Sequence, residues 1–517
     1  MQQERAGSKF NNGRGGKWVY WSMVGKFVPQ LLLFLACFSG IVCCCQTATG
    51  QATEPEIQTL TDPDTVTIAA PDAVSYVVVA NVVVKGNKLT KKPIILREMD
   101  FAPGDTLPMA TLETVLERNR NQIYNTRLFN DVTIKISEQH SNLVTFTIEV
   151  EERWYILPAP IFELADRNFN EWWVTHKRSL KRTEYGFLFV HDNFRGRKEL
   201  LKMLVQLGFT RKVELSYLIP FIDRQRKTGI NPFISYITNR EVQYLTLNNK
   251  QQFYRDEEQI LRMRFKAGIG LTRRPNIRTS HYLNLTWFYN TIADTLAQLN
   301  PNYFMNGKTR QQFLQARYEF TEDHRDIAAY PLKGYYLWLQ AAKSGWGETR
   351  DINQLWVAAK FTHYQPFGKH WFGMASIRAK TSFPTQQPYF NQEGLGFGGN
   401  NLRGYEYYII DGQHYAMLRT ALKYEVLKLK LINPLFKRLT QFRTIPFAVY
   451  LKTYAETAYV KDNFYYPQNP LNNAWLASTG IGFDIFTLYD KVFSLEYSIN
   501  RYDRKGGLFI SFGLIYD

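Results

Sequence analysis

Hydrophobic and polar residues alternate along most of the chain after Trp154. The alternation comes in segments of about 10 to 14 residues, and residues that favour turns lie between the segments. The clearest segment is 491–501, in which every second residue from Phe493 to Ile499 is apolar and the residues between them are polar. A period of two predicts a β-strand with one apolar face and one polar face.

Sixteen segments of this kind can be placed in the chain, and each is long enough to cross a bilayer as a tilted strand. They begin near Trp154, Lys181, Lys198, Arg211, Gly229, Glu258, Thr279, Arg310, Lys333, Asn353, Lys369, Gln413, Ile445, Ala474, Lys491 and Gly506. An even number lets antiparallel strands close with both ends of the sheet on one side. The pattern therefore predicts a mainly β protein, with a transmembrane antiparallel β-barrel over residues 154–517.

Residues 74–153 carry a different pattern, in which strand and helix periodicities follow one another. The order is strand, short helix, longer helix, strand and strand, over residues 74–84, 94–101, 108–124, 131–137 and 143–150. In the longer helix Leu112, Leu116 and Ile123 recur at helical spacing, so one face is expected to pack. These residues predict one small α+β domain before the barrel.

The N-terminal segment, residues 1–50, has the features of a secretory signal. Basic residues come first, and an apolar run over residues 31–45 follows them. Ala48 and Gly50 supply the small residues that a signal peptidase requires, which predicts cleavage after Gly50. The mature chain is therefore expected to be exported.

Two alternatives for this segment stay open. Met23 is a candidate true start, because a signal that begins there has a more typical length. Cys43 is a candidate lipidation site, although the bulky Val42 before it counts against this reading. The polar, proline-containing stretch 51–73 that follows is predicted to be a linker.

Composition narrows the functional classes. The formal charge of +17 is spread as single cations among aromatic residues, without a run of five basic residues, so a nucleic-acid partner is not expected. All four cysteines fall within the first 45 residues, which leaves neither a disulfide framework nor a thiolate metal site beyond them. Gly394, Gly396 and Gly399 fit G-x-G-x-x-G, but no helix is predicted after them. We expect no metal, no cofactor and no catalytic activity.

Three runs in the α+β domain carry a family resemblance. They are G-N-K-L-T-K-K-P-I-I-L-R-E from Gly86, G-D at Gly104, and N-T-R-L-F-N-D-V from Asn125. Together they resemble a POTRA domain, the small periplasmic unit of the BamA/TamA superfamily of outer-membrane assembly and translocation factors. The resemblance covers residues 74–153. It implies a bacterial outer-membrane barrel with this domain in the periplasm.

A glycine-rich stretch, residues 397–412, connects the eleventh and twelfth predicted strands. Near its middle, Leu402, Arg403, Gly404 and Tyr405 resemble the L-R-G-Y loop of the same superfamily. The resemblance implies that this stretch folds back into the barrel lumen. An ordinary hairpin loop is the alternative that the stretch alone leaves open.

An arginine inside a lumen needs an acidic partner, because burying an unpaired guanidinium is costly. Two glutamates occupy matching superfamily positions, Glu425 in L-K-Y-E-V and Glu456 in T-Y-A-E-T-A-Y-V. Strand alternation turns both of them inward. The superfamily usually has Asp and Gly where this chain has Glu456 and Ala458, so the geometry of the pairing stays open. The alternative is that all these groups are ordinary lumen charges.

The first and last strands are expected to form a lateral seam. Pro158 and Pro160 in the first strand lack the N–H group that a ladder hydrogen bond needs. The last strand ends in an apolar face that includes Phe512 and Tyr516. By resemblance, these two strands meet weakly and open toward lipid. In the alternative reading the prolines belong to a linker and the first strand starts later.

The resemblance implies that the protein inserts, folds or translocates other proteins at the outer membrane. Unfolded outer-membrane or secreted clients and outer-membrane lipids are the expected partners, and accessory lipoproteins are a further class that the resemblance allows. A secretion pore for one dedicated client is the first alternative, although such pores usually carry two POTRA units. A passive porin or an outer-membrane enzyme is the second.

Overall fold

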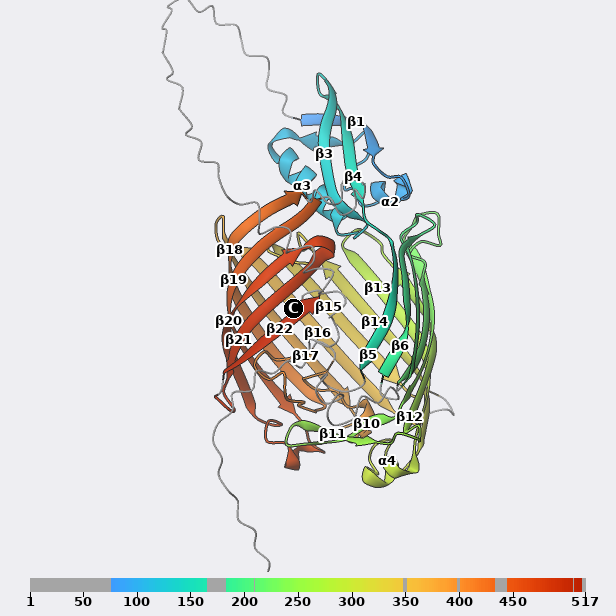
Figure 1. The fold of residues 1–517 in the computed structure, drawn as a ribbon. Helices are drawn as coiled ribbons and strands as arrows, with labels where there is room; N and C mark the ends of the chain where they lie inside the picture. The colour runs from blue at the N-terminus through green and yellow to red at the C-terminus, as the bar shows by residue number, and fades with distance from the viewer. Residues whose placement is uncertain are drawn as a thin grey trace, which may run out of the picture. The chain divides into compact units, whose positions relative to one another are not determined.

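The computed structural model describes residues 76–164, 183–208, 210–346, 351–397, 400–432, 444–504 and 506–513. A four-stranded sheet comes first in the chain, and a sixteen-stranded sheet follows it (Figure 1). The described parts of Pro63–Ile161 and Glu184–Asp517 form one compact unit. The signal predicted for residues 1–50 and the linker predicted for residues 51–73 lie outside the described residues, so both stay predictions.

The first sheet belongs to a small α+β unit. Its elements are β1 (Tyr76–Lys85), α2 (Lys92–Leu96), β2 (Thr106–Pro108), η2 (Met109–Thr111), α3 (Leu112–Tyr124), β3 (Phe129–His140) and β4 (Leu143–Glu152). The strand order is β2-β1-β4-β3, and β1 pairs in parallel with β4. The predicted order of elements is confirmed. The sequence pattern does not predict β2, because three residues are too few to show a period.

Helix α3 packs on this sheet through the face that its periodicity predicts. Leu112 and Ile123 of α3 are buried in one cluster with Phe129 of β3 and Phe146 of β4. The ring centroids of Phe146 and Phe101 lie 5.3 Å apart. Burying apolar surface of this kind is the main favourable term in folding, so this cluster holds the unit together. Among the described residues, no helix is long and apolar enough to cross a membrane.

The second sheet contains the sixteen strands that the alternation predicts. They are β5 (Ile156–Leu164), β6 (Thr183–Phe194), β7 (Glu199–Gly208), β8 (Arg211–Leu218), β9 (Thr228–Asn239), β12 (Arg262–Arg273), β13 (Thr279–Ile292), β14 (Arg310–Asp323), β15 (Gly334–Ser344), β16 (Gln354–Pro366), β17 (Trp371–Phe383), β18 (His414–Ile432), β19 (Thr444–Lys461), β20 (Trp475–Thr487), β21 (Lys491–Asn500) and β22 (Gly506–Gly513). Each strand begins within four residues of its predicted start. The sheet is antiparallel, and its strands follow one another in chain order from β5 to β22, with the hairpin β10–β11 left out. The predicted fold class is confirmed.

Alternation within each strand separates an outer face from a lumen face. In β21 the side chains of Tyr497 and Ile499 are 45% and 42% exposed, whereas Glu496 and Ser498 are 7% and 1% exposed. The apolar residues therefore cover the outside of the curved sheet, and the polar residues fill its interior. This distribution is the reverse of a soluble core and is typical of a barrel surrounded by lipid.

Two connections between strands of the barrel have features that the alternation does not predict. The stretch after β9 contains a second hairpin, formed by β10 (Glu241–Leu247) and β11 (Lys250–Arg255). Strand β18 continues to Ile432, so its connection to β19 consists of residues 433–443. Residues 433–443, which form this connection, lie outside the described residues.

The strands of the predicted seam are the two end strands of the sheet, β5 and β22. Pro158 and Pro160 lie within β5 and not in a linker, and Phe512 lies within β22. A strand with prolines is tolerated at a sheet edge, because an edge has one side that need not donate hydrogen bonds. Tyr516 lies outside the described residues.

The assignment of an outer face and a lumen face can be tested at two neighbouring residues of β15. Leu339 is 41% exposed on the outer face, whereas Gln340 points inward and donates a hydrogen bond to Glu319. Leu339→Arg is expected to destabilise the barrel by about 2 to 4 kcal/mol in lipid, because a cation then faces hydrocarbon. Gln340→Arg is the matched control and is expected to change stability little, since its cation lies beside a carboxylate. Denaturant unfolding in phospholipid vesicles, followed by tryptophan fluorescence, measures both. Equal losses would contradict the assignment of faces.

Candidate functional site

The loop between β17 and β18 packs inside the curved sheet. Leu402 and Tyr405 are buried, and they share an apolar cluster with Met417 of β18, Val460 of β19 and Leu476 of β20. The Tyr405 hydroxyl donates a hydrogen bond to the carbonyl oxygen of Ala477, at 3.3 Å. The stretch is therefore docked on the lumen wall, and the alternative of an ordinary hairpin loop is wrong.

Arg403 reaches two carboxylates from two different strands. Its Nη1 lies 3.2 Å from Oε1 of Glu456 on β19, and its Nε lies 3.2 Å from Oε1 of Glu496 on β21. The backbone N–H of Arg403 also donates to Oε2 of Glu456, at 2.9 Å. The guanidinium lies 4.6 Å from the ring centroid of Tyr454, close enough for a cation–π contact. The fork of donors on arginine suits such a bridge.

The two carboxylates each hold a second cation from the barrel wall. Arg419 of β18 is opposite Glu456 in the strand register, and its Nε lies 3.6 Å from Oε2 of Glu456. Lys452 of β19 places Nζ 2.6 Å from Oε1 of Glu496. Lys452 also forms an ion pair with Asp484 of β20. Opposite charges thus alternate across the lumen wall.

We call this set of charged side chains the lumen ion network. Its three cations and three carboxylates belong to Arg403, Arg419, Lys452, Glu456, Asp484 and Glu496. Each of these side chains is at most slightly exposed. Buried charges are costly unless partners surround them, and here each charge has an opposite neighbour.

A glycine in β20 allows the lumen ion network to extend from β19 to β21. In the register, Gly482 pairs with Lys452 on one side and with Glu496 on the other. Because Gly482 has no side chain, Lys452 can extend over β20 and contact Glu496 directly. The three residues form one row across three strands.

Gly404 fits a narrow space next to Arg403. Its φ angle is +83°, a left-handed conformation that side chains other than glycine rarely adopt. A Cβ atom at this position would lie 3.3 Å from the Cβ of Ser478 and 3.4 Å from those of Ser498 and Asn500. The Gly404 carbonyl oxygen accepts a hydrogen bond from Nδ2 of Asn500, at 2.7 Å. The conformation therefore favours glycine, and the space leaves little room for a Cβ atom.

The loop residue Glu406 lies in an environment that disfavours its charge. Burial raises the pKa of Glu406 to about 7, and the carboxylates of Glu496 and Glu456 act in the same direction. The loop therefore carries a carboxyl group whose charged form is disfavoured, beside the lumen ion network.

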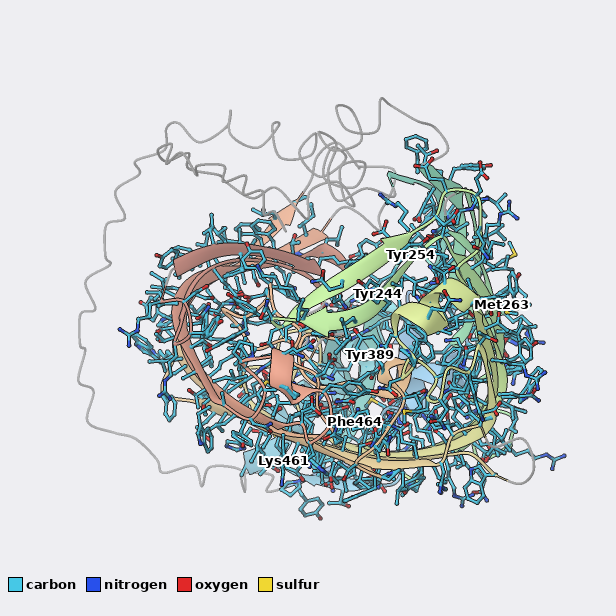
Figure 2. The ribbon with its side chains drawn as sticks, turned by 90° about the horizontal axis from the view of Figure 1, so that it is seen from below. Tyr244, Tyr254, Met263, Tyr389, Lys461 and Phe464 are labelled. Carbon is cyan, nitrogen blue, oxygen red and sulfur yellow. The ribbon has the colours of Figure 1, made fainter. Side chains whose placement is uncertain are left out.

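The hairpin β10–β11 covers the loop from the opposite side. Figure 2 shows this hairpin, with Tyr244 and Tyr254, running across the space inside the curved sheet. Its tip residue Asn249 is fully buried, and its carbonyl oxygen accepts a hydrogen bond from the backbone N–H of Ile409 at 2.8 Å. The Asn249 side chain donates to the Ile409 carbonyl oxygen and accepts from the backbone N–H of Leu471. The loop is thus held by the barrel wall and by the hairpin.

The structure brings together some of the residues that the sequence suggests and separates others. Leu402, Arg403, Gly404 and Tyr405 lie with Glu456, as expected. Glu425 lies elsewhere on β18.

The prediction that Glu425 is a partner of Arg403 is wrong. Its Oε2 accepts a hydrogen bond from the hydroxyl of Tyr450, at 3.1 Å, and its Oε1 lies 3.6 Å from Nδ1 of His370. Alternation indicates correctly that Glu425 faces inward, but it carries no information about height along the strand. Glu425 lies six residues from Arg419 on β18, and Arg419 is the residue level with Glu456.

Four members of the network are missed by sequence reasoning, namely Glu496, Arg419, Lys452 and Asp484. All of them lie on strands whose alternation turns them inward, so a signal is present. Choosing them among the other inward charges requires the strand register and the path of the loop, which the sequence pattern does not supply. No group of His, Cys, Asp and Glu that could hold a metal ion is found among the described residues.

Arg403→Ala is expected to weaken docking of the loop by about 1 to 3 kcal/mol, because Glu456 and Glu496 each lose one cation in a buried setting. The barrel should still form, since strand pairing is unchanged. Limited proteolysis of the loop measures docking, and heat-dependent migration in gel electrophoresis measures barrel formation. Arg317→Ala, at an inward position of β14, is the control. Unchanged protease resistance of the loop in Arg403→Ala would contradict the assignment.

Gly404→Ala is expected to destabilise the docked loop by more than the cost of a left-handed alanine, which is about 1 to 2 kcal/mol. Gly368 supplies the matched control, because its φ is +93° and a Cβ there would meet nothing within 4 Å. Gly368→Ala should therefore show the backbone cost alone. Hydrogen exchange measures the loss of local stability at the amides of residues 400–413 in Gly404→Ala and at the turn that contains Gly368 in Gly368→Ala. Equal local losses would show that the space around Gly404 is not limiting.

Comparison with protein families gives two matches. Residues 77–153 match the POTRA family, described as surface antigen variable number repeat. Residues 193–487, more than half of the chain, match the Omp85 superfamily domain. No curated protein matches the chain.

Several solved structures are similar to the chain at low sequence identity. BamA from Haemophilus ducreyi lacking POTRA domains 1-3 is 15% identical, with 84% of each chain covered and a TM-score of 0.47. CdiB from Escherichia coli is 12% identical, with 84% of this chain and 75% of that chain covered and a TM-score of 0.49. CdiB from Acinetobacter baumannii is 9% identical, with 85% and 74% covered and a TM-score of 0.45.

The family matches confirm the resemblance found in the α+β domain and in the barrel. The chain belongs to the Omp85 superfamily, with a POTRA domain before its barrel.

Proposed function

We propose that this protein inserts, folds or translocates client proteins at the bacterial outer membrane, with its POTRA domain in the periplasm. Membership of the Omp85 superfamily supports a role in outer-membrane insertion or translocation. The observation that carries the proposal is the docked loop, in which Arg403 joins Glu456 and Glu496 inside a barrel that follows a POTRA domain. A passive porin needs neither feature.

The edge of the POTRA sheet supplies a place for an extended client. In the order β2-β1-β4-β3, strand β2 has three residues and β3 has twelve, so β3 is the longer end strand. A groove of 380 Å³ runs between α3 and β3, and its lining includes Leu112, Leu116 and Val132. An extended segment that adds to β3 gains main-chain hydrogen bonds, and the apolar lining accepts its side chains.

The end strands of the barrel supply the route toward lipid. Pro158 and Pro160 in β5 remove two donors from that strand, which weakens its pairing on one side. A client strand that pairs with an end strand satisfies its own backbone groups, as hydrocarbon requires. The free energy then comes from burial and closure of the client. We therefore propose a mechanical role, without catalysis and without a nucleotide.

Depletion of the protein in its host, followed by quantitative proteomics of the outer membrane, tests the proposal. Broad loss of barrel proteins, with their precursors trapped in the periplasm, is the expected result. Complementation with the wild-type gene should restore them, complementation with Arg403→Ala should restore them poorly, and Arg317→Ala serves as control. Loss of one secreted partner with other barrels intact would favour a dedicated secretion pore. An unchanged outer-membrane proteome would overturn both.

A further inference from the structure

A cleft of 710 Å³ lies at the end of the barrel where β12 turns into β13. Its walls come from that turn, from the turn before β9, from the end of α2, from α3 and from the end of β14. Its charged lining consists of five cations and two carboxylates, which are Arg97, Arg118, Lys227, Arg274, Arg278, Asp100 and Glu322. We call this set of residues the basic cleft.

Two of the arginines share one buried carboxylate behind the wall. Arg274 places Nη1 and Nη2 at 2.7 and 2.8 Å from the two oxygens of Glu98. Arg97 lies 3.2 Å from the same carboxylate, and its guanidinium stacks on Phe221, 4.3 Å from the ring centroid. One negative charge therefore balances two positive charges that are fixed in position.

The remaining charges also leave an excess of positive charge. Arg118 forms an ion pair with Asp100. Arg278 donates to Nδ1 of His324 at 3.1 Å, which is a neutral partner when Nε2 of that ring donates to Glu322. Within the described residues, no carboxylate lies within ion-pair distance of Lys227 or Arg278. Counting Glu98, the cleft keeps two positive charges without a matching carboxylate.

Two residues that line the cleft, Thr279 and Glu322, lie on the outer face of the barrel. Thr279 lies on the same side of β13 as Leu283, which is exposed on the outer face. Glu322 lies on the same side of β14 as the exposed Tyr318. The apolar outer face of these strands therefore begins directly beside the basic cleft.

Polar aromatic residues mark this border. The rings of His324 and Tyr335 stack with centroids 4.4 Å apart, and the Tyr335 hydroxyl donates to Glu322 at 2.9 Å. Tyr318 bonds His281 at 2.8 Å on the same face. Tyrosine and histidine with an apolar body and a polar tip are typical of the level of lipid headgroups.

We propose that the basic cleft binds the phosphodiester headgroup of an anionic phospholipid in the inner leaflet of the outer membrane. The phosphate would meet Lys227 and Arg278, and arginine forks suit phosphate oxygens. The acyl chains would follow the outer face toward Leu283, which is about 13 Å from Thr279 along β13. An acidic peptide segment would satisfy the charges but would not use the apolar strip.

Lipid binding is a property beyond the handling of clients, and from the proposed function it takes only the membrane orientation. The test measures lipid binding directly. Lipid binding can therefore fail while the proposed function holds, and the proposed function can fail while lipid binding holds. Full-length protein in a non-ionic detergent is titrated with short-chain phosphatidylglycerol by calorimetry. Inorganic phosphate and short-chain phosphatidylcholine are titrated separately.

Lys227→Gln/Arg278→Gln is the test variant, and Lys369→Gln/Lys428→Gln is the matched control. The control removes two exposed cations from the same end of the barrel. We expect phosphatidylglycerol to bind about tenfold more weakly to the test variant and unchanged to the control. Heat-dependent migration confirms that each variant forms its barrel.

Three results would overturn the proposal. The first is equal weakening in both variants, which would indicate attraction to general surface charge. The second is binding of inorganic phosphate as strong as that of phosphatidylglycerol, which would indicate a free-anion site. The third combines two observations. An acidic peptide displaces phosphatidylglycerol, and the test variant binds phosphatidylglycerol as strongly as the wild type does.

Discussion

The pairing of Arg403 with Glu456 and Glu496 is the interaction on which the arrangement of the barrel interior depends. A guanidinium inside a lumen is stable only when acids surround it, and the loop that carries it must therefore stay against the wall. Arg419 and Lys452 extend the alternation of charge across neighbouring strands. The position of the loop therefore depends on the register of the four strands from β18 to β21.

The hairpin β10–β11 makes this position depend on a second element. Asn249 joins the loop at Ile409 and a connection near β20 at Leu471, so three segments far apart in the sequence meet at one buried asparagine. The loop cannot leave the wall without breaking these bonds or carrying the hairpin with it. In an insertion factor, movement of the loop would therefore be coupled to the hairpin that crosses the lumen.

The fold follows from the sequence to a larger extent than the site does. A period of two marks sixteen strands to within four residues, because lipid outside and water inside impose the same alternation on every strand. The alternation does not indicate how far along its strand a residue lies. The sequence therefore groups Glu425 with Arg403, although Glu425 lies with Tyr450. Glu496 and Arg419 escape notice for the same reason. The hairpin tip Asn248-Asn249 carries a turn signal, but the contacts of Asn249 depend on the path of the loop.

A double-mutant cycle on Arg403 and Glu456 tests the central claim most directly. The free energy of opening of residues 400–413 is measured by hydrogen exchange in the wild type, Arg403→Ala, Glu456→Gln and the double variant. The docked geometry predicts a coupling of about 1 kcal/mol or more, since the two side chains are in contact. Additive effects of the two substitutions would contradict it and would mean that the contact between Arg403 and Glu456 does not hold the loop.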